Sequence, residues 1–283
     1  MTEPTGPSEP ILTPLEAAAA LAAEHGLAVE RLVVLKDGSN LSVHLVPAPI
    51  VIRVATFTAR IRGDPMAWLR REVDLVSYLA SVGASVMAPS DLLPVGPHVI
   101  GGWAMCAWRY VDHHVGVVPD GSSTFAALDE LHEALGGYPG ELPLLNPAAD
   151  DLDRAIAFGV GQGLLSPAQA EDTRSRRDSL FVALTAAAPD RQALHGDAFP
   201  KNSLVTDRGI VWIDFEDCCS GPVIWDHATL LRRVDDDAIA ATIRLRHGPD
   251  ALQLALDLRG LQEEVWTVLH DARQEGLISN PGG

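Results

Sequence analysis

Short apolar runs alternate with turn-forming residues in the first part of the chain. Separated by Lys36-Asp37-Gly38-Ser39-Asn40 and Pro47-Ala48-Pro49, the runs are Leu32 to Leu35, Leu41 to Val46 and Ile50 to Ala55. Their β-branched residues and the turn residues between them predict an antiparallel meander. Because side chains alternate along a strand, Val51, Arg53 and Ala55 share one face of the third run. The pattern thus places an arginine on a face that is otherwise small and apolar.

A helical pattern follows from about Pro65 to Ala80. At 100° per residue the apolar side chains cluster within about 60° of Glu72; they are Trp68, Leu69, Leu75, Val76 and Leu79. A carboxylate at the centre of a buried face is costly unless it is paired. Arg53, on a neighbouring strand, is the candidate partner. The alternative is a glutamate at the edge of a cleft that reaches water.

The remaining pattern divides the chain into two parts. The run from Ile11 to Ala23 is too short to span a membrane and begins with the helix-capping residues Thr13, Pro14 and Glu16. A strand is predicted from Trp103 to Val111, and helical periodicity begins near Thr124. We expect an α+β chain of two lobes, residues 13–111 and 112–283, after a disordered leader at residues 1–12 without the features of a signal peptide.

Composition narrows the class of partner. The 283 residues are 47% hydrophobic and include 21 basic and 38 acidic residues, for a net charge of −17. This charge disfavours nucleic acid and anionic membranes as partners, and fits a neutral or cationic one or a simple need for solubility. The three cysteines, Cys106, Cys218 and Cys219, lack the spacing of a zinc or redox motif, so a reducing, cytoplasmic location is expected.

The densest group of polar residues follows Ala193, in the stretch ALHGDAFPKNSLVTDRGIVWIDFEDCC. His195, Asp197 and Asn202 have the spacing of a kinase catalytic loop, in which the aspartate meets the acceptor hydroxyl and the asparagine binds a metal ion. A hairpin predicted over 203–213 would return the chain to the same place and deliver Asp214, where kinases have a Mg²⁺ ligand.

Other interpretations of this segment are weaker. Aspartate and asparagine are common in turns, so each of the three could be a turn or cap residue of an unrelated α/β protein. A metallohydrolase site would explain His195 and Asp197 but would leave Asn202 and Glu72 unexplained. A protein kinase would carry arginine in place of Gly196 and an Ala-Pro-Glu segment after Asp214.

The segment resembles the HGDxxxxN motif, the Asp-Phe metal motif and the Gly-Pro-x-x-Trp-Asp-x-Ala helix start of the aminoglycoside phosphotransferase family. The resemblance extends over about Leu32 to Leu231 and implies a protein-kinase-like fold with an antiparallel N-lobe sheet, one key N-lobe helix, and a mainly helical C-lobe with a catalytic hairpin. It implies ATP or GTP as co-substrate, Mg²⁺, and a small-molecule hydroxyl acceptor.

The resemblance also implies roles for individual residues. Asp197 would be catalytic, Asn202 and Asp214 would bind metal, and His195 and Asp226 would support the loop. The nucleotide would lie between the lobes and contact a set of N-lobe residues, namely Ser39, Val51, Arg53, Glu72, Trp108, Arg109, Tyr110 and Val111. The Gly38-Ser39-Asn40 turn departs from a full glycine-rich loop, and Arg53 stands where lysine is usual, though arginine supplies the same charge.

The acceptor is the least defined part of the prediction. Acidic residues of the C-terminal third could line a pocket for an aminated sugar or could be solvated helix faces; they are Asp235, Asp236, Asp237, Glu263, Glu264 and Asp271. Lys201 could touch phosphate or be solvated. An aminoglycoside, a housekeeping metabolite, and a non-catalytic nucleotide-binding pseudokinase all stay open.

Overall fold

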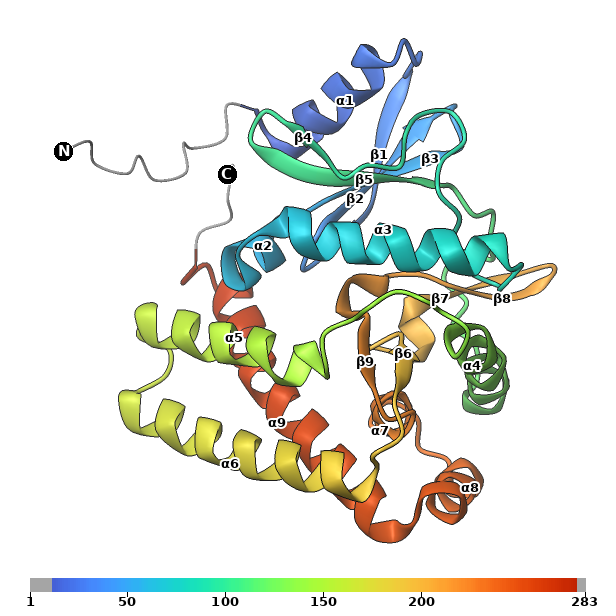
Figure 1. Cartoon of the computed structure of the whole chain (residues 1–283). Helices are drawn as coiled ribbons and strands as arrows, with labels where there is room; N and C mark the ends of the chain where they lie inside the picture. The colour runs from blue at the N-terminus through green and yellow to red at the C-terminus, as the bar shows by residue number, and fades with distance from the viewer. Residues whose placement is uncertain (1–11, 279–283) are drawn as a thin grey trace. The chain divides into compact units, whose positions relative to one another are not determined.

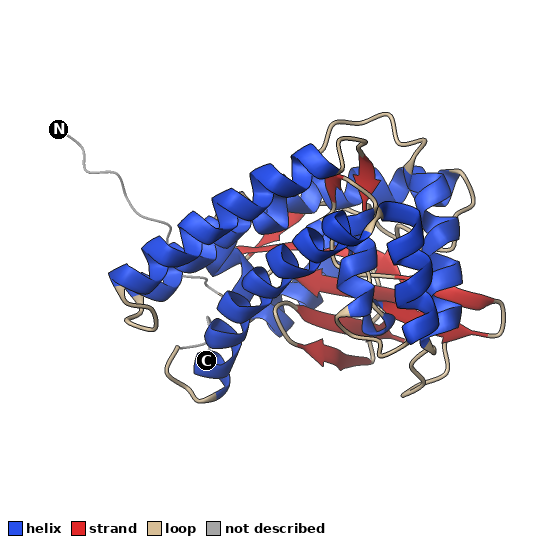
Figure 2. Ribbon diagram, turned by 90° about the horizontal axis from the view of Figure 1, so that it is seen from below, coloured by secondary structure: helices blue, strands red, loops and turns tan. Residues whose placement is uncertain are grey.

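The computed structural model describes residues 12–278, which form two compact units. The first unit contains residues 12–73 and 88–111, and the second contains residues 74–87 and 112–278. Helix is the predominant secondary structure (Figure 2). None of the helices in residues 12–278 has both the length and the hydrophobicity needed to cross a membrane. Apart from Leu12, the predicted leader lies outside the described residues.

The first unit is built on a five-stranded antiparallel sheet with the order β1-β2-β3-β5-β4 (Figure 1). Its strands are β1 (Arg31–Asp37), β2 (Leu41–Val46), β3 (Ile50–Val54), β4 (His98–Ile100) and β5 (Trp103–Arg109). The predicted meander is confirmed in β1, β2 and β3, and the predicted strand after Trp103 is confirmed as β5.

One face of this sheet is covered by α1 (Pro14–Glu24). The helix begins with the predicted capping box, in which Thr13 and Glu16 satisfy each other's backbone N–H groups. Three of its alanines and Leu21 join the completely buried Ile50, Ile52 and Val54 of β3 in one hydrophobic core. Because β3 alternates, Arg53 projects from the opposite face of the sheet.

Two helices follow β3, namely α2 (Phe57–Arg62) and α3 (Pro65–Ser81). The apolar stripe predicted around Glu72 is confirmed, because Trp68, Leu69, Leu75, Val76 and Leu79 are all buried. Glu72 itself is completely buried, so the alternative of a glutamate that reaches water is wrong.

The second unit is mainly helical. Its helices are α4 (Gly121–Leu135), α5 (Asp150–Gly161), α6 (Pro167–Ala187), α7 (Ile224–Leu231), α8 (Asp237–His247) and α9 (Pro249–Gln274). The long helix α9 packs against α5, α6 and α7 (Figure 1). Side chains of α7, α8 and the first half of α9 share a hydrophobic core that includes Trp225.

Two short antiparallel pairs complete this unit. They are β6 (Gln192–Leu194) with β9 (Cys219–Gly221), and β7 (Ser203–Thr206) with β8 (Gly209–Trp212). The second pair is the hairpin predicted over 203–213. An antiparallel sheet in one unit and a largely helical second unit with a hairpin confirm the predicted α+β class.

Candidate active site

The segment from His195 to Asn202 connects β6 to β7 and ends in a short 3₁₀ turn, Pro200–Asn202. Gly196 has a φ of 87°, in the left-handed region that favours glycine. A Cβ at this position would lie 1.9 Å from the backbone oxygen of Asp217. The loop therefore requires glycine here, which explains why the arginine of protein kinases is absent.

The side chain of Asp226, in the first turn of α7, forms hydrogen bonds to the backbone of this loop. Its two carboxylate oxygens accept the backbone N–H groups of His195, at 3.0 Å, and Gly196, at 2.9 Å. Nε2 of His132 donates to the same carboxylate at 3.0 Å. Burial alone would raise the pKa of Asp226, but the His132 hydrogen bond and the other donors lower it below its usual range. Asp226 is thus a charged, buried brace.

His195 connects the loop to the strand that precedes Asp214. Its Nδ1 accepts the backbone N–H of Asp197 at 3.3 Å, so its Nε2 is the nitrogen that donates to the carbonyl oxygen of Ile213, at 3.0 Å. The N–H of Ile213 donates in turn to the carbonyl of Asn202 at 2.9 Å. These two bonds fix Ile213 beside the loop and thereby bring the next residue, Asp214, close to Asp197.

Asn202 positions the carboxylate of Asp197. Its amide nitrogen donates to Oδ2 of Asp197 at 2.8 Å and to the backbone oxygen of Asp197 at 2.9 Å. The nitrogen is therefore committed to Asp197, and the amide oxygen is the atom that Asn202 can offer to a metal ion. Together with the Asp214 carboxylate it provides the hard oxygen ligands that Mg²⁺ prefers.

Arg259 of α9 is a site residue that the sequence reasoning missed. One of its guanidinium nitrogens forms an ion pair with Oδ1 of Asp197, while another donates to Gln262 at 2.8 Å. Arg259 and Gln262 lie on the same buried side of α9 as Leu258 and Leu261. A polar pair within an apolar stripe is the same signal that identified Glu72, so periodicity could have found it.

The environment of Asp197 raises its pKa above the ordinary value, because burial outweighs the opposing attraction of Arg259. The charges of Asp217 and Asp214 add to this upward shift. Asp217, buried in the turn after Asp214, is a second acidic neighbour that the sequence reasoning did not single out. The Asp197 side chain keeps 22% of its surface exposed, so an acceptor can reach it.

In the first unit, the predicted ion pair of Arg53 and Glu72 is present. Nη1 of Arg53 lies 2.8 Å from Oε1 of Glu72, and the two side chains are 7% and 0% exposed. The pair links β3 to α3. A guanidinium in this position adds a fixed positive charge to the face of the sheet opposite the α1 core.

Three of the other predicted nucleotide contacts, Val51, Trp108 and Arg109, lie on adjacent strands of the same sheet. Val51 of β3 pairs directly with Trp108 of β5. The Tyr110 ring stacks on the His44 ring, with 4.0 Å between the ring centroids. The backbone N–H of Tyr110 donates to the carbonyl oxygen of Pro49. Arg109 points outward to Asp91, at 2.9 Å. Strand β5 ends at Arg109, so Tyr110 and Val111 form the connection that follows it.

The Gly38-Ser39-Asn40 turn is tied to the start of α2. The carbonyl oxygen of Ser39 accepts the backbone N–H of Thr58 at 3.0 Å, and Oδ1 of Asn40 accepts the N–H of Thr56 at 3.1 Å. These bonds fix the turn through its acceptor groups. They give it a defined conformation despite the single glycine.

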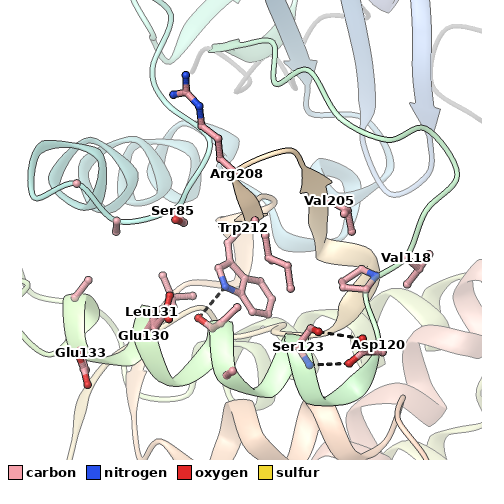
Figure 3. A pocket seen from close by; sticks show the side chains of 18 of the residues that line it. Ser85, Val118, Asp120, Ser123, Glu130, Leu131, Glu133, Val205, Arg208 and Trp212 are labelled. Atoms are coloured by element: carbon pink, nitrogen blue, oxygen red, sulfur yellow. Dashed lines mark hydrogen bonds between the residues drawn. The ribbon is translucent and has the colours of Figure 1, made fainter.

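A cavity of about 840 Å³ in the second unit lies between α4 and the β7–β8 hairpin (Figure 3). The Trp212 indole points to α4, where its N–H donates to the carbonyl oxygen of Ala127 at 3.2 Å. Asp197, Asn202 and Asp214 are not among the lining residues. We therefore assign this cavity no part in the catalytic site.

The geometry of the loop agrees with the comparison to protein families. The model of the phosphotransferase enzyme family matches residues 33–263. The chain belongs to this family. Members of the phosphotransferase enzyme family transfer phosphate groups, so the chain is a phosphotransferase by family. No curated protein is similar enough to count as a match.

Solved structures share the fold of this phosphotransferase at low sequence identity. Amicoumacin kinase hAmiN, in complex with AMP-PNP, Ca²⁺ and Ami, has 14% identity and a TM-score of 0.66, with 89% of this chain and 86% of that chain covered. An aminoglycoside phosphotransferase, APH(3″)-Id from Streptomyces rimosus, has 16% identity and a TM-score of 0.62, with 89% and 99% covered.

A choline/ethanolamine kinase family protein from Mesorhizobium loti has 20% identity and a TM-score of 0.61, with 93% of this chain and 88% of that chain covered. These likenesses confirm the predicted kinase-like fold. The relatives are kinases for different small molecules, so the fold alone does not select an acceptor.

Proposed function

We propose that this phosphotransferase moves the γ-phosphate of ATP or GTP onto a hydroxyl of a small molecule in a Mg²⁺-dependent reaction. The observation that carries the proposal is that the Asp197 carboxylate accepts hydrogen bonds from both Asn202 and Arg259. The contacts of Ile213 also bring Asp214 close to it. This arrangement fixes one carboxylate and supplies oxygen ligands beside it.

Each residue then has a distinct task. Asp197 orients the acceptor hydroxyl and takes its proton late, as the oxygen bonds to phosphorus and the nucleoside diphosphate leaves. The raised pKa of Asp197 makes it a stronger base than an ordinary aspartate. Asn202 and Asp214 would hold Mg²⁺, which supplies charge neutralisation when bound. Arg53, positioned by Glu72, would bind the α- and β-phosphates.

Arg259 adds a further residue to the proposed site. Its guanidinium already contacts the catalytic carboxylate, so a phosphate group that approaches Asp197 also approaches Arg259. Buried positive charge at this point stabilises the negative charge that accumulates on the transferring group. We include Arg259 in the site as a positioning residue for Asp197.

The charges around Asp197 bear on the choice of acceptor. Glu263, one of the acids that the sequence offered for an aminated substrate, instead forms ion pairs with Arg232 at 2.7 Å, Arg233 at 3.2 Å and Arg259 at 3.4 Å. Asp236 caps α8. The guanidinium of Arg233 also lies 5.6 Å above the Phe199 ring of the catalytic loop.

The charge of Glu263 is thus balanced by arginines, while Asp197, Asp214 and Asp217 keep the loop itself acidic. Glu263 is therefore removed as a ligand for an aminated group, which supports a housekeeping metabolite as one class of acceptor. The amino-sugar alternative is supported by the family resemblance and by relatives such as APH(3″)-Id. A pseudokinase is disfavoured because Asp197, Asn202, Asp214 and Glu72 are all present.

A panel assay tests the proposed function. Nucleoside diphosphate release from ATP and from GTP would be measured with Mg²⁺ against neutral, anionic and aminated hydroxyl compounds. The Asp197→Asn variant is the blank. We expect at least one acceptor to raise release above the blank. The absence of any acceptor-dependent release, in a protein that binds nucleotide, would favour the pseudokinase.

A further inference from the structure

A cluster of two histidines and one aspartate lies in the second unit, outside the residues assigned to phosphate transfer. Asp129 and His132 are three residues apart on α4 and so share one face of that helix. His227 projects from α7. One carboxylate oxygen and one ring nitrogen of each histidine all lie within 4.8 Å of one another.

Each of the two histidines has one buried ring nitrogen that no hydrogen bond within residues 12–278 satisfies. Nδ1 of His132 and Nε2 of His227 have no hydrogen-bond partner among the residues that the structure describes, and Nε2 of His227 lies 3.5 Å from Oδ1 of Asp129. The His132 and His227 side chains are 7% and 0% exposed. A buried nitrogen without a partner is costly unless something else occupies its lone pair.

The other nitrogen of each ring is held by a neighbour. Nε2 of His132 donates to the Asp226 carboxylate at 3.0 Å, and Nδ1 of His227 lies 2.9 Å from Nε2 of His247. Metal-binding histidines are oriented by such outer hydrogen bonds, most often to a carboxylate.

We propose that Asp129, His132 and His227 bind a transition-metal ion with the preferences of Zn²⁺. Two imidazole nitrogens and one carboxylate oxygen form a donor set that suits Zn²⁺, with a water as the fourth ligand. In a tetrahedral zinc site such atoms lie about 3.4 Å apart. Side-chain shifts of about 1 Å from the present spacing close the site around an ion.

Arg246 is a neighbouring cation that the site must accommodate. It donates to both oxygens of Asp129, at 2.6 and 3.0 Å. Each carboxylate oxygen has a second lone pair, so Asp129 can keep Arg246 and bind a metal as well. The Arg246 side chain is 41% exposed, and solvent therefore weakens its repulsion of the ion.

The site is connected to the catalytic loop by a single side chain. Asp226 accepts from His132 and also from the N–H groups of His195 and Gly196. An ion at His132 would therefore fix the partner of the residue that braces the loop. It would stabilise the second unit without touching nucleotide or acceptor.

Zinc titration of the chelator-treated full chain tests the proposal. A chromophoric chelator would compete for Zn²⁺ in excess Mg²⁺, which occupies oxygen-rich sites but competes poorly for imidazole. We expect one Zn²⁺ per chain and a higher midpoint of thermal unfolding. Co²⁺ in its place should give the visible absorption of a tetrahedral ion.

Variants locate the ion. His227→Gln and Asp129→Asn should each weaken Zn²⁺ binding by more than about tenfold, the loss typical when zinc ligation is disturbed. His270→Gln, which changes a histidine of α9 outside the cluster, should bind as the unaltered protein does. Either variant assigns the site if the other does not fold. Less than one ion per chain, or unchanged affinity in a folded ligand variant, would overturn the proposal.

Discussion

Asp197 is held by two donors of different character, the neutral amide of Asn202 and the guanidinium of Arg259. The amide fixes the direction of the carboxylate, whereas the guanidinium also stabilises its charge. Both are needed because burial raises the pKa of Asp197 and so favours the protonated form, which cannot accept a proton. At the scale of single residues, the role that we propose for Asp197 depends on this balance.

Replacement of Arg259 tests this balance. Arg259→Gln removes a charged hydrogen bond from a partly exposed carboxylate and should lower the free energy of unfolding by about 2 kcal/mol. It should lower kcat while the KM for nucleotide changes little, and should move the acidic limb of the pH–rate profile to higher pH. Arg259→Lys keeps the charge and should recover part of the loss.

The matched control is Arg244→Gln, at an exposed arginine of α8. Kinetics and urea unfolding of the three variants provide the comparison. If Arg259→Gln kept the kcat and pH profile of the unaltered protein, its contact with Asp197 would have no part in turnover.

Asn202 and Asp214 make a second prediction at this scale. Asn202→Ala and Asp214→Ala should each weaken Mg²⁺-dependent nucleotide binding, because both residues are assigned as oxygen ligands. Isothermal titration with nucleotide at increasing Mg²⁺ would measure the effect. Asn202→Ala should also lower kcat through the loss of its bond to Asp197. Identical Mg²⁺ dependence in both variants and the unaltered protein would remove them from the metal site.

At the scale of elements, two buried carboxylates join segments that are distant in sequence. Glu72 connects α3 to β3 through Arg53, and Asp226 connects α7 to the catalytic loop and to α4. Neither carboxylate is exposed, so each depends on its donors for compensation.

The Arg53–Glu72 pair can be tested by a double-mutant cycle. Glu72→Gln or Arg53→Ala should each lower stability by about 3–5 kcal/mol, the cost of leaving one charge of a buried pair, and should weaken nucleotide binding. The double variant should be less damaged than the sum of the single variants, because neither charge is then left alone. Strict additivity in thermal unfolding and in nucleotide affinity would show that the pair does not act as a unit.

Asp226 gives a prediction for pH. Its pKa is lowered in the folded state, so its contribution to stability is complete above the unfolded value of about 3.9 and is lost as pH falls below it. Asp226→Asn should cost about 3 kcal/mol at neutral pH. The difference from the unaltered protein should shrink as the pH approaches about 3. Urea unfolding across this range is the measurement, and a difference independent of pH would contradict the assignment.

At the scale of the whole molecule, patterns within short stretches were the most predictable. The meander, the hairpin and the buried face of α3 follow from alternation and helical periodicity, and all are confirmed. The Arg53–Glu72 pair could be predicted because a strand and a helix each place one charged residue on an otherwise apolar face, and a buried charge needs a partner. The family resemblance supplied the fold and is confirmed by the family match.

Contacts set by long-range packing were not predictable. Arg259 is 62 residues from Asp197, and His132 is 94 residues from Asp226. Local periodicity shows that such residues are buried but does not show which partner they meet. For the same reason the sequence did not indicate that Glu263 pairs with arginines. It instead suggested Glu263 as a possible contact of an aminated acceptor.

The central claim, that Asp197 serves the acceptor and not the nucleotide, has a direct test. Single-turnover phosphate transfer and equilibrium nucleotide binding would be measured on Asp197→Asn, with Asp207→Asn, at an exposed aspartate of the hairpin turn, as the matched control. We expect Asp197→Asn to lose transfer and to keep nucleotide affinity, whereas Asp207→Asn keeps both. Transfer by Asp197→Asn at more than a small fraction of the control rate would contradict the account.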